Sequence, residues 1–345
     1  MSEEIPGRRK GRKFEVVNPD DSITAETFTA PVFWKSEKGM WKEIQNQLIQ
    51  TPEHPNFQYK NQSNKWSSWF SYFRDNQVLN RIELGPYAVN MKPLNASKPV
   101  IQTSNESITY KRIFPFVDIM YQVLPTGLKE NIVLQNSQAQ NEFSFVLDMT
   151  DNLLPDLING ELFIRDSVTN EEIFQIPKAI MTDKNGEISD QVNLGLSKIE
   201  GQWVLTIIAN QEWLNQKATK YPITIDPTII VTEIKTNKFA ETRDKTVASK
   251  VALTDQTYLA VGENLNGINR SYLWFKLPGL NSGARILNAQ LKLHQYVNAA
   301  SLDTFVDVHP VLQPWGDEIT WSTKPNHGAT IASANSNKEG SVTGE

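Results

Sequence analysis

Cysteine is absent from this 345-residue chain, and histidine is scarce. Without cysteine the protein has no disulfide, no thiolate nucleophile and no cysteine-ligated zinc or iron–sulfur site. The four histidines lie in no nucleophile or metal motif, and the sequence carries no P-loop, G-x-S-x-G, H-E-x-x-H or G-x-G-x-x-G pattern. These absences predict a protein that is not an enzyme, with no catalytic residues, no metal site and no cofactor.

Long apolar runs and an excess of positive charge are missing as well. No window reaches the 18 apolar residues of a membrane span, and the start, MSEEIPGRRKGRKF, shows no apolar core of a signal peptide. A net charge of −5 argues against nucleic acid as a partner. The one basic run, RRKGRK (Arg8 to Lys13), is typical of a solvated tail.

Strand signals dominate what is present. Short runs rich in Val, Ile, Thr and aromatic residues, such as FSFVLDM (Phe143 to Met149) and QWVLTIIAN (Gln202 to Asn210), alternate apolar and polar positions. Asn-Gly pairs in DKNGE and NLNGIN mark hairpin turns between such runs. The pattern predicts an all-β, mostly antiparallel fold.

Helical periodicity is limited to two short segments. GMWKEIQNQLIQ (39–50) places Trp41, Ile44 and Leu48 at helical spacing, and NQEWLNQKA (210–218) has a similar character. We predict a short helix in each.

A domain boundary is indicated near residue 232. Pro222 and Pro227 interrupt the extended run KYPITIDPTIIVTEIKT, which suits a strand leaving a sheet for a linker. The predicted organisation is a basic and polar tail with lead-in over 1–25, a β-rich domain over 26–232, and a β-sandwich module over 233–345.

Aromatic residues are the informative group, at 10% of the chain. The segment NKWSSWFSYFRDN crowds five of them into eight residues, which is too many for one face of one strand. Core packing is the favoured interpretation of this segment, and a surface patch is the alternative. The aromatic residues concerned are Trp66, Trp69, Phe70, Tyr72 and Phe73.

A second aromatic stretch runs from residue 269 to residue 296. In RSYLWFKL, alternation points Leu273, Phe275 and Leu277 inward, and NAQLKLHQY behaves likewise. If the two strands pair antiparallel, their other side chains line one outer surface. Because flat rings stack on the apolar faces of sugars, this surface is the predicted carbohydrate-binding site. Its residues are Tyr272, Trp274, His294 and Tyr296.

Three other groupings of polar residues are candidates for chemistry. Asp307 and His309 share a strand face but supply too few ligands to specify a metal. Asp317 and Glu318 are adjacent, so on an extended chain they point apart, and a hydrolase is the least favoured class. DKNGEISD (183–190) has a passing likeness to a calcium loop but lacks its bidentate Glu, so calcium is only weakly supported and a hairpin turn is favoured.

Four pieces in a fixed order resemble the DNRLRE domain family, whose members are β-sandwich modules of large bacterial surface proteins. They are TYLAVGENLNGINRSYLWFKLPGL, ARILNAQLKL, VDVHPV and WGDEITWSTKP, within residues 240–325. The family is classed in part with carbohydrate-binding modules. The resemblance implies a jelly-roll-like sandwich that is truncated here or completed by further chain.

Upstream pieces resemble the N-terminal β region of Gram-positive wall-associated and RHS (YD-repeat) proteins. They include FTAPVFWKSEKGMWKEIQNQL, IFPFVDIMYQVLPTGLKENIVL and EWLNQKATKYPITIDPTI. Together the two likenesses imply a non-catalytic scaffold or adhesion protein that recognises cell-surface or cell-wall polysaccharide, as part of a larger parent chain.

Two alternatives stay open at this point. The chain could be a structural component of a phage tail or other particle, where the β modules self-associate, or the carrier segment of an RHS toxin. All three imply an extracellular, cell-surface or virion-associated location.

Overall fold

The structure of the protein is a computed structural model. The chain divides into two compact units, and each unit is described separately. Two units are separated between Phe239 and Ala240, whereas the sequence predicted a boundary near residue 232. We call them unit 1 (Met1–Phe239) and unit 2 (Ala240–Glu345). The structure describes residues 3–4, 9, 11, 13–28, 30–73, 78–216, 219–231, 242–249, 259–264, 267–275, 291–294, 304–316, 318–336 and 341–344.

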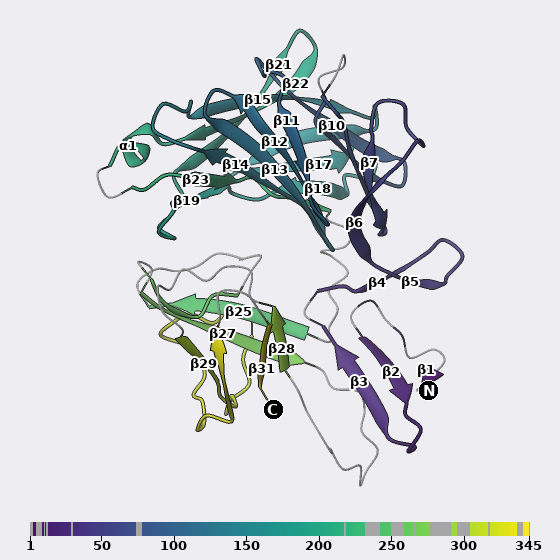
Figure 1. The fold of residues 1–345 in the computed structure, drawn as a ribbon, viewed down its shortest axis with the longest axis vertical. Coiled ribbons are helices and arrows are strands. Elements are labelled where there is room, and N and C mark those ends of the chain that lie inside the picture. Colours follow the sequence, from purple (N-terminus) through teal and green to yellow (C-terminus); the bar gives the residue numbers. More distant parts are fainter. Residues whose placement is uncertain are drawn as a thin grey trace. The chain divides into compact units, whose positions relative to one another are not determined.

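Antiparallel strands are the dominant secondary structure in the described residues of both units (Figure 1), and the prediction of an all-β fold is confirmed. The one helix among the described residues, α1, is a single turn at Gln211–Leu214. In that part of the chain no helix is long and apolar enough to cross a membrane.

The first large sheet of unit 1 has eight strands in the described residues. Its central strands pair in regular antiparallel register, for example Asn90 with Arg81 on one side and with Asp148 on the other. In spatial order the strands are β21 (Val192–Ile199), β22 (Gln202–Ala209), β15 (Glu142–Met149), β10 (Tyr87–Pro93), β9 (Asn80–Leu84), β8 (Ser67–Phe70), β7 (Tyr59–Ser63) and β6 (Gln45–Gln50).

The second large sheet of unit 1 has eleven strands in the part of the chain that the structure describes. Eight lie in the order β11 (Val100–Thr103), β12 (Ser107–Phe114), β13 (Val117–Leu124), β14 (Gly127–Leu134), β24 (Ile229–Val231), β18 (Glu172–Ile176), β17 (Glu161–Asp166) and β16 (Leu153–Ile158). The other three are β19 (Ile180–Thr182), β20 (Ile188–Ser189) and β23 (Ile223–Asp226). Of these, β23 pairs with β14, β19 pairs with β23, and β20 pairs with β19.

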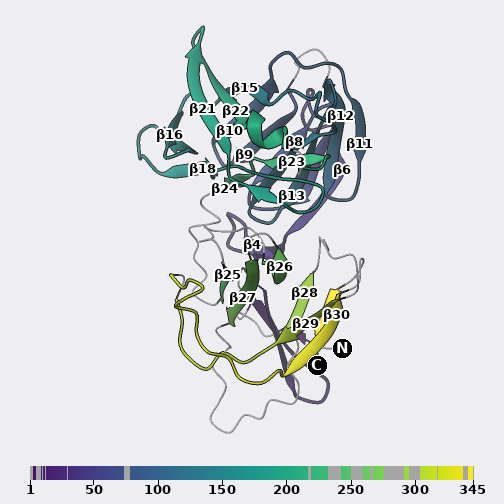
Figure 2. The same cartoon turned by 90° about the vertical axis from the view of Figure 1, so that its left-hand side faces the viewer.

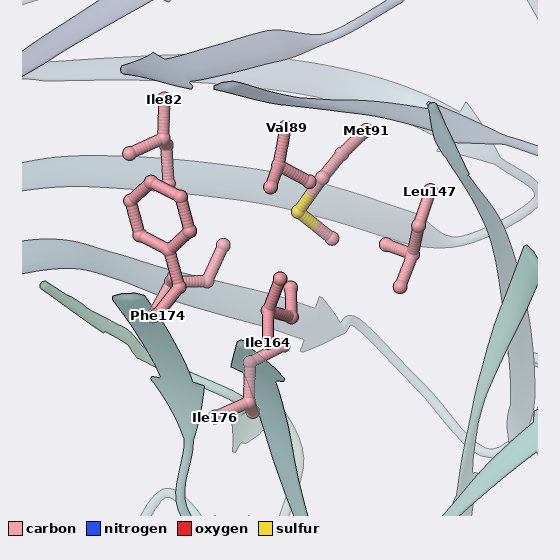
Figure 3. A pocket seen from close by; sticks show the side chains of 8 residues that line it. Ile82, Val89, Met91, Leu147, Ile164, Phe174 and Ile176 are labelled. Atoms are coloured by element: carbon pink, nitrogen blue, oxygen red, sulfur yellow. The ribbon is translucent and has the colours of Figure 1, made fainter. Parts of the chain in front are cut away.

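The two large sheets bury one apolar core between them. Figure 3 shows Ile82 and Met91 from the eight-stranded sheet opposite Ile164 and Phe174 from the eleven-stranded sheet. The gap that these side chains line has a volume of about 10 Å³, and no polar surface borders it. A space of that size holds at most one water, so it is a packing defect and not a ligand site.

Close approach of two backbones explains one glycine at the edge of this core. Gly127 begins β14, where it pairs with Ile230 of β24. A Cβ atom on Gly127 would lie 2.2 Å from the carbonyl oxygen of Ile229. Glycine is therefore the residue that lets β24 insert beside β14.

The N-terminal segment predicted as a tail contains strands. β1 (Glu3–Glu4), β2 (Lys13–Val17) and β3 (Ile23–Thr27) form a three-stranded sheet, and β4 (Phe33–Lys35) pairs with β5 (Trp41–Glu43). Phe14 of β2 meets Phe33 of β4 edge to face, with ring centroids 5.7 Å apart. Aromatic contacts thus join the lead-in to the hairpin that follows it.

The helix predicted over residues 39–50 is wrong, because β5 and β6 occupy this segment. The pairing of β6 with β7 shifts register between Gln45 and Leu48. Such an irregularity breaks the two-residue alternation of a strand, which mimics the spacing of a helix in the sequence. The second predicted helix is confirmed as α1, which begins after Asn210, whose side chain accepts a hydrogen bond from the Trp213 amide at 2.8 Å.

The crowded aromatic segment lies in the core of unit 1, so the favoured interpretation is confirmed. Only part of it is the strand β8, and the chain leaves the sheet on either side. This geometry lets rings from neighbouring positions reach the interior together. The buried members are Trp66, Trp69, Phe70 and Phe73, while Tyr72 is partly buried.

A proline lies in the outermost strand of the eleven-stranded sheet. Pro155 of β16 stands opposite Ile164 of β17, and β16 ends the order of the sheet. Proline has no amide hydrogen, so it is tolerated in edge strands, where the missing donor faces away from the partner.

Unit 2 contains three small sheets in the described residues. The largest has the order β25 (Thr242–Ala248), β27 (Gly267–Phe275) and β26 (Gly262–Asn264), and β25 and β27 run side by side in Figure 1. β28 (Leu291–His294) pairs with β31 (Ser341–Gly344), as Figure 1 shows, and β29 (Thr304–Val308) pairs with β30 (Ala332–Ser336), as Figure 2 shows.

Candidate functional site

One face of β27 carries the candidate site. Arg270, Tyr272 and Trp274 alternate along the strand and therefore share a face. Val247 of β25 stands opposite Arg270 and is 3% exposed, so it belongs to the same face. The opposite face of the same two strands carries a polar contact, in which the Ser271 and Thr246 hydroxyl oxygens lie 2.7 Å apart.

A distant loop packs on the Tyr272 face. Tyr272 meets Trp315 edge to face, with ring centroids 6.0 Å apart, and Ile319 completes a small buried cluster with Val247. Tyr272 is only 5% exposed, and this burial raises the pKa of its hydroxyl, while nearby Arg270 acts in the opposite direction. We call residues 312–316 and 318–326 the aromatic loop.

Two cationic side chains lie over the ring of Trp321, at the edge of the cluster formed by Val247, Tyr272 and Ile319. The Arg270 guanidinium lies 5.4 Å from the centre of the Trp321 ring, and the Lys324 ammonium lies 4.1 Å from it. Lys324 also donates a hydrogen bond of 2.7 Å to the Trp321 carbonyl oxygen, which fixes its position on the loop. The rim therefore combines half-buried indole surface with positive charge.

The structure describes the side chains of two of the four predicted carbohydrate-binding residues, Tyr272 and Trp274. The prediction that Tyr272 is open to solvent is wrong, because the aromatic loop covers it. Trp274 is 37% exposed, and its contact with a sugar stays a prediction. His294 lies in β28, but its side chain, like the whole of Tyr296, is outside the described residues.

The predicted hairpin between β27 and β28 is not formed by the described residues. There β27 pairs with β25 and β26, and β28 pairs with β31. Both expected partners have the right alternation, but sequence pattern alone does not select which strands become neighbours.

The predicted hairpin turn at DKNGE is confirmed, and its apparent calcium ligand is otherwise engaged. Asp183 is buried, and it accepts backbone hydrogen bonds from Asn185, Glu187 and Lys220 at 2.8–2.9 Å. The carboxylate thus closes the turn between β19 and β20.

No metal cluster forms at the other acidic groupings within the described ranges. In that part of the chain no three His, Asp or Glu side chains are arranged to hold a metal ion. Asp307 instead accepts a hydrogen bond of 2.6 Å from Ser333, and Asp317 lies outside the described residues.

The most perturbed carboxyl group lies in the core of unit 1, away from any surface. Glu130 is fully buried, and it accepts a hydrogen bond of 2.9 Å from the Tyr121 hydroxyl. Burial raises its pKa to about 8, and Asp226 adds to this rise, while the Tyr121 bond opposes it. A perturbed carboxyl often marks an active site, but the Glu130 side chain is fully buried and presents no surface to a substrate in solution.

Sequence reasoning missed four residues of the site. Trp315, Trp321 and Lys324 come from the aromatic loop, and Arg270 lies on the strand face already singled out. A signal was present, since WGDEITWSTKP carries two tryptophans six residues apart in an otherwise polar segment.

A family match bears directly on unit 2. Residues 235–342 match carbohydrate-binding module family 96. The matched range includes nearly the whole of unit 2, with β27 and the aromatic loop. The match supports carbohydrate binding by this unit.

Relatives with assigned functions are much longer proteins. The tRNA nuclease WapA of Bacillus subtilis strain 168 is 26% identical over 261 residues, which cover 70% of this chain and 11% of the relative. The tRNA3(Ser)-specific nuclease WapA of Bacillus spizizenii is 25% identical with the same coverage. Because 70% of 345 residues is more than twice the length of unit 2, the similarity extends into unit 1. No solved structure matches the chain.

Proposed function

We propose that this chain is a non-catalytic segment of an extracellular adhesion protein, and that unit 2 binds cell-surface or cell-wall carbohydrate. The observation that carries the proposal is the half-buried indole surface at the rim of the Tyr272 cluster, inside the range that matches a carbohydrate-binding family. Aromatic rings give sugars a flat apolar surface, and a few polar groups around them set orientation.

The charges at the rim favour an acidic glycan. Arg270 and Lys324 both lie over the ring of Trp321, so a sugar stacked beside that indole would meet two cations. A carboxylate or phosphate on the sugar gains charge-assisted hydrogen bonds there, which a neutral sugar cannot form. We therefore assign the ligand to the class of acidic polysaccharides.

The length of the relatives favours a second role for the same chain. The relatives are nucleases, and the chain covers 11% of their length. We propose that the segment serves as a carrier in a longer toxin and contributes attachment, while nuclease chemistry belongs to other parts. Incubation of the purified chain with tRNA should leave the RNA intact, and cleavage would overturn this assignment.

Binding to immobilised polysaccharides tests the main proposal. The wild-type chain should bind acidic polysaccharides more tightly than neutral ones, and added salt should weaken the binding. Trp321→Ala should reduce affinity by about tenfold or more, and Lys324→Met should reduce affinity for the acidic probes only.

Phe305→Ala is the matched control, because Phe305 is a 72% exposed aromatic residue of unit 2 on β29. It should leave binding unchanged. No binding to any polysaccharide, or equal binding by wild type and Trp321→Ala, would contradict the proposal. Trp274→Ala tests separately whether the exposed indole of β27 extends the site.

A further inference from the structure

Two histidines close the base of the aromatic loop. Val311 and His327 form an isolated antiparallel bridge, flanked by backbone hydrogen bonds of 2.9 Å from Leu312 to Asn326 and from Gly328 to Pro310. We call this pairing the neck. The chain that leaves and re-enters the neck is the loop that carries Trp315, Ile319 and Trp321.

The rings of His309 and His327 meet at the neck. Their centroids are 4.5 Å apart, and the ring planes are tilted by 58°. The Nδ1 atom of each ring lies 3.0 Å from the same acceptor, the carbonyl oxygen of Gly328. Because a carbonyl oxygen only accepts, both Nδ1 atoms carry hydrogen, and a neutral ring then keeps its lone pair on Nε2.

The neck leaves little room for relaxation. A Cβ atom on Gly328 would lie 2.9 Å from Pro310, so the two segments are in tight contact. Two imidazolium ions held at this separation would repel each other, and the shared carbonyl oxygen would offer its lone pairs to both.

Asp307 and Lys324 are the charged side chains to weigh against that repulsion in the described residues. No ion pair there involves either ring. Asp307, on the strand that leads to His309, is engaged by Ser333 of β30. Lys324, on the loop itself, is held by Trp321.

We propose that His309 and His327 form a proton-sensitive clasp that holds the aromatic loop closed at neutral pH and releases it in acid. This inference rests on the proposed function where it concerns the ligand, because the loop supplies Trp321 and Lys324 to the carbohydrate site. Carbohydrate binding should therefore be weaker in acid than at neutral pH.

The test follows the loop and the ligand separately. The full chain labelled with 5-fluorotryptophan should show ¹⁹F signals of Trp315 and Trp321 that shift or broaden between pH 7.5 and pH 5.0. The buried Trp66 of unit 1 serves as internal reference. Signals are assigned with single Trp→Phe variants.

The decisive variant is the double substitution His309→Asn and His327→Asn. The asparagine Nδ2 stands near the position of the histidine Nδ1, so each side chain keeps a donor for Gly328 but cannot gain a proton. Its loop signals should not respond to pH. His54→Asn in unit 1 is the matched control, and it should retain the wild-type response. Far-UV circular dichroism checks that each variant is folded.

Binding is measured with polygalacturonic acid as the acidic probe. Affinity of the wild-type chain should fall about fivefold from pH 7.5 to pH 5.0. Affinity of the double variant should change less than about twofold.

The outcomes separate the two proposals. Loop signals that respond to pH in the wild type and not in the double variant uphold the clasp, even if no polysaccharide binds and the proposed function falls. Wild-type loop signals that ignore pH, or that respond equally in the double variant, overturn the clasp while leaving carbohydrate binding intact.

Discussion

Unit 1 encloses one continuous apolar core between two large sheets, whereas the described part of unit 2 buries a cluster of three hydrophobic residues with tryptophans packed on its rim. Burial on the scale of unit 1 fixes a fold, because apolar area removed from water is the main favourable term in folding. In the described part of unit 2, the aromatic side chains of Trp274 and Phe305 are exposed to solvent. This contrast with the enclosed core of unit 1 is what the carbohydrate-binding role proposed for unit 2 requires.

The largest effect is expected from Phe174→Ala. Phe174 is fully buried between the sheets of unit 1, and its loss should lower the free energy of unfolding by about 3–5 kcal/mol. Urea denaturation followed by tryptophan fluorescence measures the change. Phe305→Ala, at an exposed site in unit 2, should stay within about 0.5 kcal/mol. A transition of unit 2 that moves together with that of unit 1 would contradict the division into separate compact units.

A pH-dependent effect is expected from Glu130. Its pKa is raised from 4.5 to about 8 in the folded chain, so between these values the unfolded state loses a proton that the folded state keeps. The stability of unit 1 should therefore fall as pH rises from 4.5 to 8, with no further loss above that range.

Glu130→Gln removes this dependence. The variant should exceed wild type in stability at pH 8 by on the order of 3 kcal/mol and approach it at pH 4.5. Denaturation curves at both pH values measure the difference, with Glu161→Gln, at a half-buried position, as control. Parallel pH profiles of wild type and Glu130→Gln would show that the buried carboxyl does not control the stability of unit 1.

A smaller loss is expected from Asp183→Ala, which removes the acceptor of two backbone amides in the β19–β20 turn and of the Lys220 amide. Leaving these donors without a partner should cost about 1–3 kcal/mol. Added calcium should not change the melting temperature of the wild-type chain. A calcium-dependent rise would revive the calcium loop and set unit 1 apart as the ligand-binding unit.

The smallest loss is expected from Ile319→Ala in unit 2, at about 1–2 kcal/mol. Ile319 is 7% exposed, but its neighbours on the aromatic loop are only partly buried and can close the gap. Ile164→Ala in unit 1, at 3% exposure between rigid sheets, is the matched comparison and should cost more. Equal costs would mean that the core of unit 2 is as firmly packed as that of unit 1.

Local pattern predicted much of the fold. Alternation in β13 and β14 places Ile119, Leu128 and Ile132 in the core, as the structure shows. The same alternation puts Glu130 in phase with Leu128 and Ile132, so its burial was readable from the sequence. The register shift in β6 could not be predicted from the sequence, because no residue pattern identifies one extra residue in a strand.

The candidate site was predictable only in part. The aromatic face of β27 follows from alternation, but its cover comes from a loop some forty residues further along the chain. Contacts between distant segments depend on which strands pair, and on pattern alone β27 and β28 were acceptable partners for each other. Tyr272 was therefore placed on the right face with the wrong exposure.

Pro155 has a consequence for chains displayed side by side. Where many copies of a β protein are tethered at high local concentration, an edge strand with all its donors can recruit a strand from a neighbouring copy and seed a growing ribbon. Pro155 has no backbone N–H group, so a strand of a neighbouring copy that paired with β16 would lack one hydrogen bond in the middle of the pairing. Crowding on a surface would then leave neighbouring copies as separate molecules along this edge.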